Sequence, residues 1–237
     1  MKLLPLFKSL QSAALISACA ASLLLSTGAQ ALSVVSGLFS TGVDSGGVSL
    51  PGTTYDGSHN VTSLSNEIHW TLTSTPGGYE VGGGSLTPRV LTSASGYPIP
   101  PWLGDSAQSA WIAPTPIGNT TNNQLGSWTY NTSFNISGLV SGLSIGGRWA
   151  VDNSSANILV NFNNQNQFIT TGDAFTAWHS FVLTSGFLEG TNNLEIIVTN
   201  SGGPTGLRVE IPEPATLALV GLALIGGFGV SRKRKQA

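Results

Sequence analysis

The sequence predicts an all-β body, folded as an antiparallel β-sandwich, between two targeting segments. Short apolar or alternating runs recur through residues 32–211, and clusters of Gly, Asn and Pro separate them at short intervals. Hardly any of this region has the 3.6-residue apolar period of a helix. Turn-separated strands without intervening helices favour a sandwich over βαβ units, and 180 residues suffice for one substantial core.

The expected strands follow the apolar side chains. In the run 128–136, Trp128, Tyr130, Phe134 and Ile136 stand at even spacing, which places them on one face of a regular strand. The other expected strands are 68–73, 147–151, 157–162, 168–170, 178–183, 194–198 and 206–211. Four tryptophans in these strands are assigned to the core, because large rings fill the space between sheets: Trp70, Trp128, Trp149 and Trp178.

Residues 88–116 are rich in proline and irregular, so we expect a long ordered loop that crosses the sandwich, with at most one short strand at 110–112. This loop holds Trp102, Asp105 and Trp111. Sugars dock on exposed aromatic faces beside polar groups, so these three residues are candidates for glycan binding. The alternative is that both rings pin the loop to the sandwich.

The charged residues of the body argue against one class of function. All four lysines lie in the terminal segments, and between Leu32 and Ile211 three arginines stand against ten acidic residues, a formal charge of −7. The whole-chain charge of −2 hides this acidity. Because nucleic-acid binding rests on a basic surface that contacts phosphates, no nucleic-acid partner is expected.

Residues 1–31 have the features of a signal peptide. Two lysines precede an apolar stretch from Leu10 to Leu25, and Ala29 and Ala31 supply the small residues that signal peptidase reads. An alternative is a lipoprotein signal with acylated Cys19, although the apolar run continues past that residue. Cleavage after Ala31 would leave no cysteine, and therefore no disulfide framework and no cysteine-based zinc site.

Residues 212–237 form a tail with three parts. Pro212, Glu213 and Pro214 make a short turn that cannot continue a helix backwards. A charge-free run of 16 residues, 215–230, follows; as a helix it spans about 24 Å, a little less than a hydrocarbon core of about 30 Å. A basic cluster then closes the tail: Arg232, Lys233, Arg234 and Lys235. Because such a cluster stays in the cytoplasm, we expect the body on the other side of the membrane.

This order of turn, apolar segment and basic cluster resembles the PEP-CTERM sorting signal of exported bacterial proteins. The resemblance implies a route through the inner membrane, with residues 215–230 inserted, and processing by the membrane protease exosortase. Signal peptidase is the second expected processing partner. The alternative is an ordinary C-terminal membrane anchor.

Two motifs of the body carry a second resemblance. Residues 147–153 read Gly-Arg-Trp-Ala-Val-Asp-Asn and residues 190–194 read Gly-Thr-Asn-Asn-Leu. In this order they resemble the galactose-binding-like jelly-roll module found on many PEP-CTERM proteins. That pattern ends one strand in Asn-Gly, but here Phe162 follows Asn161, so we expect the tight turn to move to 163–166. The resemblance implies a non-catalytic jelly-roll that binds or organises exopolysaccharide in a biofilm.

Neither catalysis nor metal binding has a recognised motif in the body. There is no nucleophile elbow and no Walker A loop, and the three histidines lack metal-ligand spacing. Several acidic residues could pair in a glycosidase, but we interpret them as surface charges: Glu67, Glu80, Asp105, Asp152, Asp173, Glu189 and Glu195. No cofactor is expected, and a structural calcium ion stays open because oxygen ligands suit sandwich loops. Its candidate ligands are Asp44, Asp152, Asn153 and Asp173.

Together these features predict an exported, non-catalytic protein of the cell envelope or extracellular matrix. One alternative is an extracellular polysaccharide-acting enzyme, which would need two acids around one cleft. The other is a purely structural matrix component, which would have no concave aromatic or acidic pocket.

Overall fold

The computed structural model describes residues 33–56, 58, 60–78, 86–96, 100–114, 124–153, 156–170 and 174–212 of the chain. All of them belong to one compact unit, which begins at Ser33. The predicted signal peptide and the tail beyond Pro212 lie outside the described residues. Among those that are described, no helix is long and apolar enough to cross a membrane.

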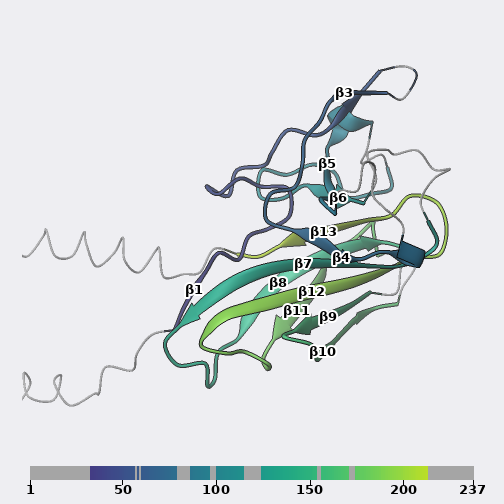
Figure 1. Ribbon diagram of the computed structural model, residues 1–237. Coiled ribbons are helices and arrows are strands. Elements are labelled where there is room, and N and C mark those ends of the chain that lie inside the picture. Colours follow the sequence, from purple (N-terminus) through teal and green to yellow (C-terminus); the bar gives the residue numbers. More distant parts are fainter. Residues whose placement is uncertain are drawn as a thin grey trace, which may run out of the picture. The chain divides into compact units, whose positions relative to one another are not determined.

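The first layer of the body is a six-stranded antiparallel sheet (Figure 1). Its strands are, in spatial order, β1 (Val34–Ser36), β7 (Gly126–Ser137), β12 (Gly190–Asn200), β9 (Ala156–Val160) and β10 (Asn163–Ile169), and β4 (Thr71–Ser74) also pairs with β7. The long pair β7 and β12 forms the middle of the sheet. The pairing of these two strands is continuous: Gly190 lies opposite Ile136 at one end, and Asn200 lies opposite Gly126 at the other.

The second layer is a five-stranded antiparallel sheet. Its spatial order is β11 (His179–Leu183), β8 (Ile145–Asp152), β13 (Gly206–Glu210), β6 (Trp111–Ala113) and β5 (Arg89–Leu91). Two short strands, β2 (Thr54–Tyr55) and β3 (Val61–Ser63), pair with each other outside both sheets. The remaining elements are the 3₁₀-helices η1 (Pro76–Gly78) and η2 (Ser93–Ser95).

The main core lies between the two sheets. The alternation predicted for β7 is confirmed: Trp128, Tyr130, Phe134 and Ile136 are buried, and the residues that face the other way are exposed or half-buried. Residues of the opposite sheet join the same core: Trp149, Val151, Leu207 and Val209. Burial of one side chain of this size contributes about 1.5–3 kcal/mol. The prediction of an all-β sandwich is therefore confirmed.

The proline-rich region 88–116 differs from its prediction because it holds two strands. Strand β6 overlaps the expected strand at 110–112, but β5 was not expected. All three residues of β5 are buried, and its free edge is paired, since Val90 N donates to Ser65 O (2.9 Å) and Thr53 N donates to Val90 O (2.9 Å). A strand buried on both faces lacks the alternation that marks a half-buried one. The strand expected at 68–73 begins late, at Thr71.

The turn between β9 and β10 lies at Asn161 and Phe162, so its predicted position at 163–166 is wrong. Both residues have positive φ, 48° and 65°. Asparagine tolerates this region, but phenylalanine rarely enters it. The Asn161 side chain holds the turn: its Nδ2 donates to Gly186 O (2.8 Å) and to Asn192 Oδ1 (2.7 Å).

Candidate functional site

The outer face of the five-stranded sheet is covered by a second apolar cluster. This cluster consists of Leu91, Trp102, Trp111, Ala113 and Ala150. Trp111 is fully buried and Trp102 is only 8% exposed, with the two ring centroids 4.5 Å apart. Trp111 Nε1 also donates to Leu103 O (2.9 Å). The two rings therefore hold the loop onto the sheet.

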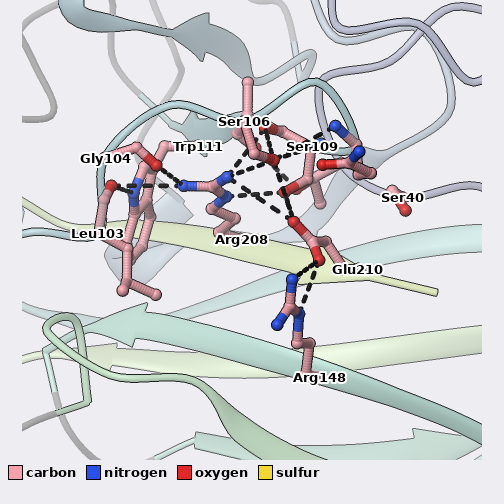
Figure 2. Close-up of polar contacts among 12 residues, drawn as sticks. Ser40, Leu103, Gly104, Ser106, Ser109, Trp111, Arg148, Arg208 and Glu210 are labelled. Atoms are coloured by element: carbon pink, nitrogen blue, oxygen red, sulfur yellow. Dashed lines mark hydrogen bonds and ion pairs between the residues drawn. The ribbon is translucent and has the colours of Figure 1, made fainter. Parts of the chain in front are cut away.

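A buried arginine fastens the same loop. The Arg208 guanidinium, 1% exposed, points from β13 into the loop and donates five hydrogen bonds (Figure 2). Two go to the carbonyl oxygens of Leu103 (3.3 Å) and Gly104 (2.5 Å). Three go to Ser106 Oγ (2.8 Å), Ser109 Oγ (2.7 Å) and Ser109 O (3.1 Å). Because every N–H group has an acceptor, the buried charge is solvated by the loop itself.

Glu210 completes this network two residues later on β13. Its Oε1 accepts from Ser106 Oγ (3.1 Å) and Ser109 Oγ (2.9 Å), and its Oε2 accepts from Arg148 Nε (2.7 Å) (Figure 2). Burial alone would raise the pKa of Glu210, but the hydrogen bonds from Arg148, Ser109 and Ser106 hold that pKa below its ordinary value. The network is saturated, so it has a structural role.

Of the predicted glycan-binding residues, Trp102 and Trp111 thus lie inside this covering and present no open ring, whereas Asp105 is exposed. A sugar needs an exposed aromatic face to stack on, and neither indole offers one. Asp105 is engaged as well, since its carboxylate accepts from Ser93 N (2.9 Å) and Ser93 Oγ (2.6 Å). The arrangement corresponds to the alternative, in which both rings pin the loop.

Trp178 corrects a second expectation about the aromatic residues. It precedes β11 rather than lying in the strand, and it is half-buried instead of being part of the main core. The guanidinium carbons of Arg148 and Arg208 lie 4.5 Å and 5.0 Å from its ring centroid. The ring packs over these two cations and extends the covering of the outer face.

The calcium candidates are not gathered into one described site. Asp44 Oδ1 accepts from Gly46 N (2.8 Å) and Val48 N (3.0 Å) and so closes its own turn. Asp152 and Asn153 are neighbours at the end of β8, where Asn153 Nδ2 donates to Asp152 Oδ1 (2.8 Å). Asp173 lies outside the described residues. In the described part of the chain, no three His, Cys, Asp or Glu side chains come together in a way that could hold a metal ion, and a calcium site stays a prediction.

The outer face of the six-stranded sheet has a different character. The outward side chains of its strands β7, β12, β9 and β10 are all exposed or half-buried. We call this surface the open sheet face and define it by Thr129, Asn131, Ser133, Asn135, Thr191, Asn193, Glu195, Ile197, Thr199, Asn157, Leu159, Asn164 and Phe168. Nine of these side chains are uncharged hydrogen-bonding groups, and Glu195 is the one charge among them.

The strand register arranges the open sheet face in rows. Asn157 lies opposite both Phe168 and Ile197, and Ile197 lies opposite Thr129. Directly paired residues of an antiparallel sheet point to the same side, so these four side chains form one row across the sheet. Phe168 stands at the end of this row with 57% of its surface exposed. It is the aromatic side chain of the face.

One part of the open sheet face is hollowed. A shallow depression of about 290 Å³ is lined by Ser36, Gly37, Ser133, Phe134, Asn135 and Thr191. Its polar groups are hydroxyls and one amide, and Ser133 Oγ beside it donates to Asn193 Oδ1 (2.9 Å). Ligand pockets begin at about 300 Å³, so the depression is of a size for a single small ring.

The sequence analysis predicted neither the open sheet face nor the Arg208 network, although a pattern of alternating residues marks each of them. Thr129, Asn131, Ser133 and Asn135 alternate with the apolar residues of β7. Arg208 and Glu210 likewise alternate with Leu207 and Val209. These patterns indicate which side chains leave the main core. They do not indicate whether another segment covers them.

Comparison with protein families finds the PEP-CTERM protein-sorting motif at residues 210–235. The predicted sorting motif is thereby confirmed, and the chain carries the signal of an exported protein that exosortase sorts. The matched range begins at Glu210, inside β13. No curated protein matches the chain.

Among solved structures, the chain is similar to family 35 carbohydrate-binding modules. For CBM35 from Paenibacillus barcinonensis the TM-score is 0.32 at 16% identity, covering 64% of this chain and 99% of that one. For a module from an environmental isolate it is 0.31 at 14% identity, covering 61% and 92%. For a module from Clostridium thermocellum it is 0.27 at 18% identity, covering 60% and 88%. Likeness at such TM-scores assigns neither fold nor ligand, and the sandwich is established by its own sheets.

Proposed function

We propose that this exported protein binds an uncharged polysaccharide on its open sheet face and serves, without catalysis, in the cell envelope or extracellular matrix. The sorting tail would deliver it there, with residues 215–230 inserted in the inner membrane during transit. The observation that carries the proposal is the open sheet face itself, a surface of uncharged hydrogen-bonding side chains with one exposed aromatic ring.

The chemistry of the face suits sugar hydroxyls. Asn amides both donate and accept hydrogen bonds, as do Ser and Thr hydroxyls, so they match groups that do the same. The rows repeat at about 4.8 Å from strand to strand, and side chains of one face repeat at about 6.8 Å along each strand. A regular, extended surface fits a chain-like ligand better than a single sugar. Phe168 adds an apolar surface against which a ring can pack.

The charges of the body favour a neutral ligand. Glu195 is the charged member of the open sheet face, and the body carries a formal charge of −7. Arg89 and Arg208 are buried, and the half-exposed Arg148 already pairs with Glu210 through Nη2 (2.5 Å) on the other sheet. Uronic-acid or sulfated polymers would therefore meet repulsion rather than a cation.

An enzymatic function has less support, because three of the candidate acids that the structure describes, Glu67, Asp105 and Asp152, are engaged structurally. The Glu67 carboxylate accepts hydrogen bonds from the backbone N–H groups of Gly42 (2.6 Å), His69 (2.8 Å) and Ile68 (3.0 Å). Asp152 is buried at the end of β8. Glycoside hydrolysis requires two carboxylates about 5–10 Å apart across an accessible cleft. Glu195 is flanked on its neighbouring strands by Asn131 and Leu159, not by a second acid.

A glycan array tests the proposal. The full chain is purified in a non-glycosidic detergent and applied to neutral and acidic polysaccharides at low and high salt. We expect binding to neutral polymers with little salt dependence, and an affinity about tenfold lower for Phe168→Ala. The matched control is Phe162→Ala, whose ring is even more exposed but lies at the β9–β10 turn outside the open sheet face.

The other outcomes separate the alternatives. If the chain binds no polysaccharide, the purely structural role replaces the proposed one. Equal losses for Phe168→Ala and Phe162→Ala would remove the open sheet face as the site. Release of reducing ends from any polymer would favour the enzymatic alternative.

A further inference from the structure

Five segments of the chain meet at one end of the sandwich. The antiparallel pairing places the start of β1 beside the end of β7 (Val34 opposite Ser137) and the start of β12 beside the same strand end. The end of β9, the end of β11 and the end of β13 lie at this end too, by their pairing with β12 and β8. We call it the exit end and define it by residues 33–34, 138–144, 161–162, 184–189 and 211–212. Figure 1 shows β1 and the end of β13 on the left, toward this end.

The exit end exposes large apolar side chains and almost no charge. Its exposed large apolar residues are Val34, Leu139, Phe162 and Leu188, of which Phe162 is 79% exposed. Among the residues of its five segments, Glu189 is the one charged residue. Single exposed apolar side chains are common on proteins, but several on neighbouring loop tips of one end indicate a surface that meets another phase or partner.

Hydrogen bonds hold these tips in place. Ser33 Oγ donates to Leu139 O, which ties the loop 138–144 to the start of β1. Asn192 Oδ1 accepts from Leu188 N (2.8 Å) and from Asn161 Nδ2 (2.7 Å), so one amide joins the tips that carry Leu188 and Phe162. The apolar side chains are therefore presented by a fixed surface, which lowers the entropic cost of placing them in an interface.

The exit end is also where the chain leaves for its tail, by a short connection. Ile211 is held on both sides of its backbone by Ser40 Oγ, which accepts from Ile211 N (3.1 Å) and donates to Ile211 O (3.5 Å). Thr41 N donates to Val209 O (3.1 Å) just before it. Only residues 212–214 separate this anchored strand end from the apolar run at 215. Four residue steps span at most about 14 Å.

This length is small against the dimensions of a bilayer. The headgroup layer on each side of the hydrocarbon core is roughly 5–8 Å thick. With residue 215 at the hydrocarbon boundary, Ile211 lies within the headgroups or at most about 6–9 Å above them. The strand end at Ile211 therefore stays close to the membrane while the tail is inserted.

We infer that the exit end is a lipid-facing surface, which seats the apolar tips Val34, Leu139, Phe162 and Leu188 in the headgroup layer while the tail is inserted. This inference rests on the membrane insertion in the proposed function. Apolar tips with a single acid among them, Glu189 beside Leu188, suit this layer, because apolar side chains gain by leaving water there. The open sheet face then extends sideways from the membrane and stays accessible to polysaccharide.

Site-directed fluorescence quenching tests the surface. Leu139→Cys and Leu188→Cys at the exit end, each combined with Cys19→Ser so that only one thiol is present, are labelled with an environment-sensitive dye. Leu125→Cys is the matched control, because Leu125 is 61% exposed and precedes β7 at the opposite end of the sandwich. The full chain is placed in nanodiscs of phosphatidylcholine and phosphatidylglycerol that contain a headgroup-linked quencher. We expect quenching at 139 and 188 to exceed that at 125 by about threefold, since apolar tips enter the layer by about 5 Å.

A variant with a longer linker tests whether the exit end binds the headgroup layer by itself or is only held near it by the short connection to the tail. A Gly-Ser linker of about 15 residues between Ile211 and Pro212 lets the body drift tens of ångströms from the membrane. We expect quenching at 139 to persist with this linker. Its fall to the level of the 125 control would overturn the inference, as would equal quenching at all three positions without the linker.

Two further outcomes identify what failed. If the chain does not co-elute with nanodiscs, the proposed membrane insertion is refuted, and the inference falls with it. The chain could instead co-elute while the dye at 139 stays unquenched. If the unlabelled Leu139→Cys variant then crosslinks two chains, the exit end contacts a second copy. That result overturns the inference and leaves the glycan proposal intact.

Discussion

The two outer faces of this sandwich differ in coverage: a loop covers one of them, and the other is exposed to solvent. The five-stranded sheet carries Trp111 and Arg208 on its outer face, and residues 100–110, which include Trp102, close over both. The six-stranded sheet carries Asn, Ser and Thr on its outer face, and these side chains stay exposed or half-buried. Large and ionic side chains thus lie under the loop, and small uncharged ones meet the solvent.

This contrast shows where function can reside. A buried guanidinium whose five donors are all occupied has no capacity left for a ligand, whatever its chemical character. The open sheet face keeps most of its amides and hydroxyls available to the outside. The side chains that look most suited to binding in the sequence are engaged elsewhere: Trp70, Trp128 and Trp149 lie in the main core, and the other tryptophans and Arg208 belong to the covered face. The uncharged Asn, Ser and Thr residues belong to the open sheet face, which is accessible to a ligand.

Removal of the buried cation should have the largest effect on stability. Arg208→Met leaves the Gly104 carbonyl and the hydroxyl oxygens of Ser106 and Ser109 without the donor that Arg208 supplies, so we expect a loss of about 3–5 kcal/mol in the free energy of unfolding. Urea denaturation followed by tryptophan fluorescence measures this loss. Arg208→Lys should be intermediate, because an ammonium keeps the charge but not the planar fork.

Arg148→Met is the matched control for that experiment. Both arginines contact Glu210, but the Arg148 side chain is 49% exposed. A pair screened by solvent contributes about 0–1 kcal/mol. Equal losses for the two variants would mean that burial of the network has no energetic consequence, and the contrast between the two faces would lose its basis.

A pH-dependent effect should follow from Asp152, also on the covered face. Burial raises the pKa of Asp152 to about 7, although hydrogen bonds from Trp102 and Asn153 oppose the shift. A carboxyl with a raised pKa binds its proton in the folded state, so its stabilising contribution is present below about pH 4 and is lost as the pH rises through 7. We expect the wild type to lose about 2–3 kcal/mol between pH 5 and pH 8 through this group.

Asp152→Asn should remove that loss. Denaturation midpoints measured across the range should coincide for the two proteins below about pH 4 and separate progressively up to about pH 7, with the variant more stable above pH 4. Parallel curves at all pH values would show that Asp152 titrates normally, and would exclude it from the buried cluster.

The sequence predicted the elements whose side chains alternate, and it failed where burial has another pattern. Strands β7, β8, β12 and β13 were all expected near their observed positions. Strand β5 was missed, because its three residues are buried on both faces and show no alternation. The turn at Asn161 and Phe162 was misplaced, because a bulky residue at positive φ contradicts local preference and is held by contacts with residues about 25–30 positions away.

The site was harder to predict than the fold for a related reason. Trp102 lies among prolines in an irregular loop, which favours exposure, and only the cluster with Trp111 on the distant strand β6 buries it. Exposure of a strand's outward side depends on whether a remote segment folds over it. Local sequence carries no information about such coverage. The sorting tail was predictable because its signal is local and needs no tertiary structure.

The smallest predicted effect concerns stability on the open sheet face. Ser133→Ala and Thr129→Ala remove hydroxyls from exposed or half-buried positions of β7, so each should change the free energy of unfolding by less than about 0.5 kcal/mol. The Ser133 hydroxyl does donate to Asn193 Oδ1, but water can replace it on that surface, and the Ala variant leaves no buried group unpaired. Denaturation of both variants beside Arg208→Met makes the comparison direct. A loss above about 2 kcal/mol for either hydroxyl would show that the open sheet face is a covered one, packed against something that the described residues do not include, and the surface could then not be free to bind polysaccharide.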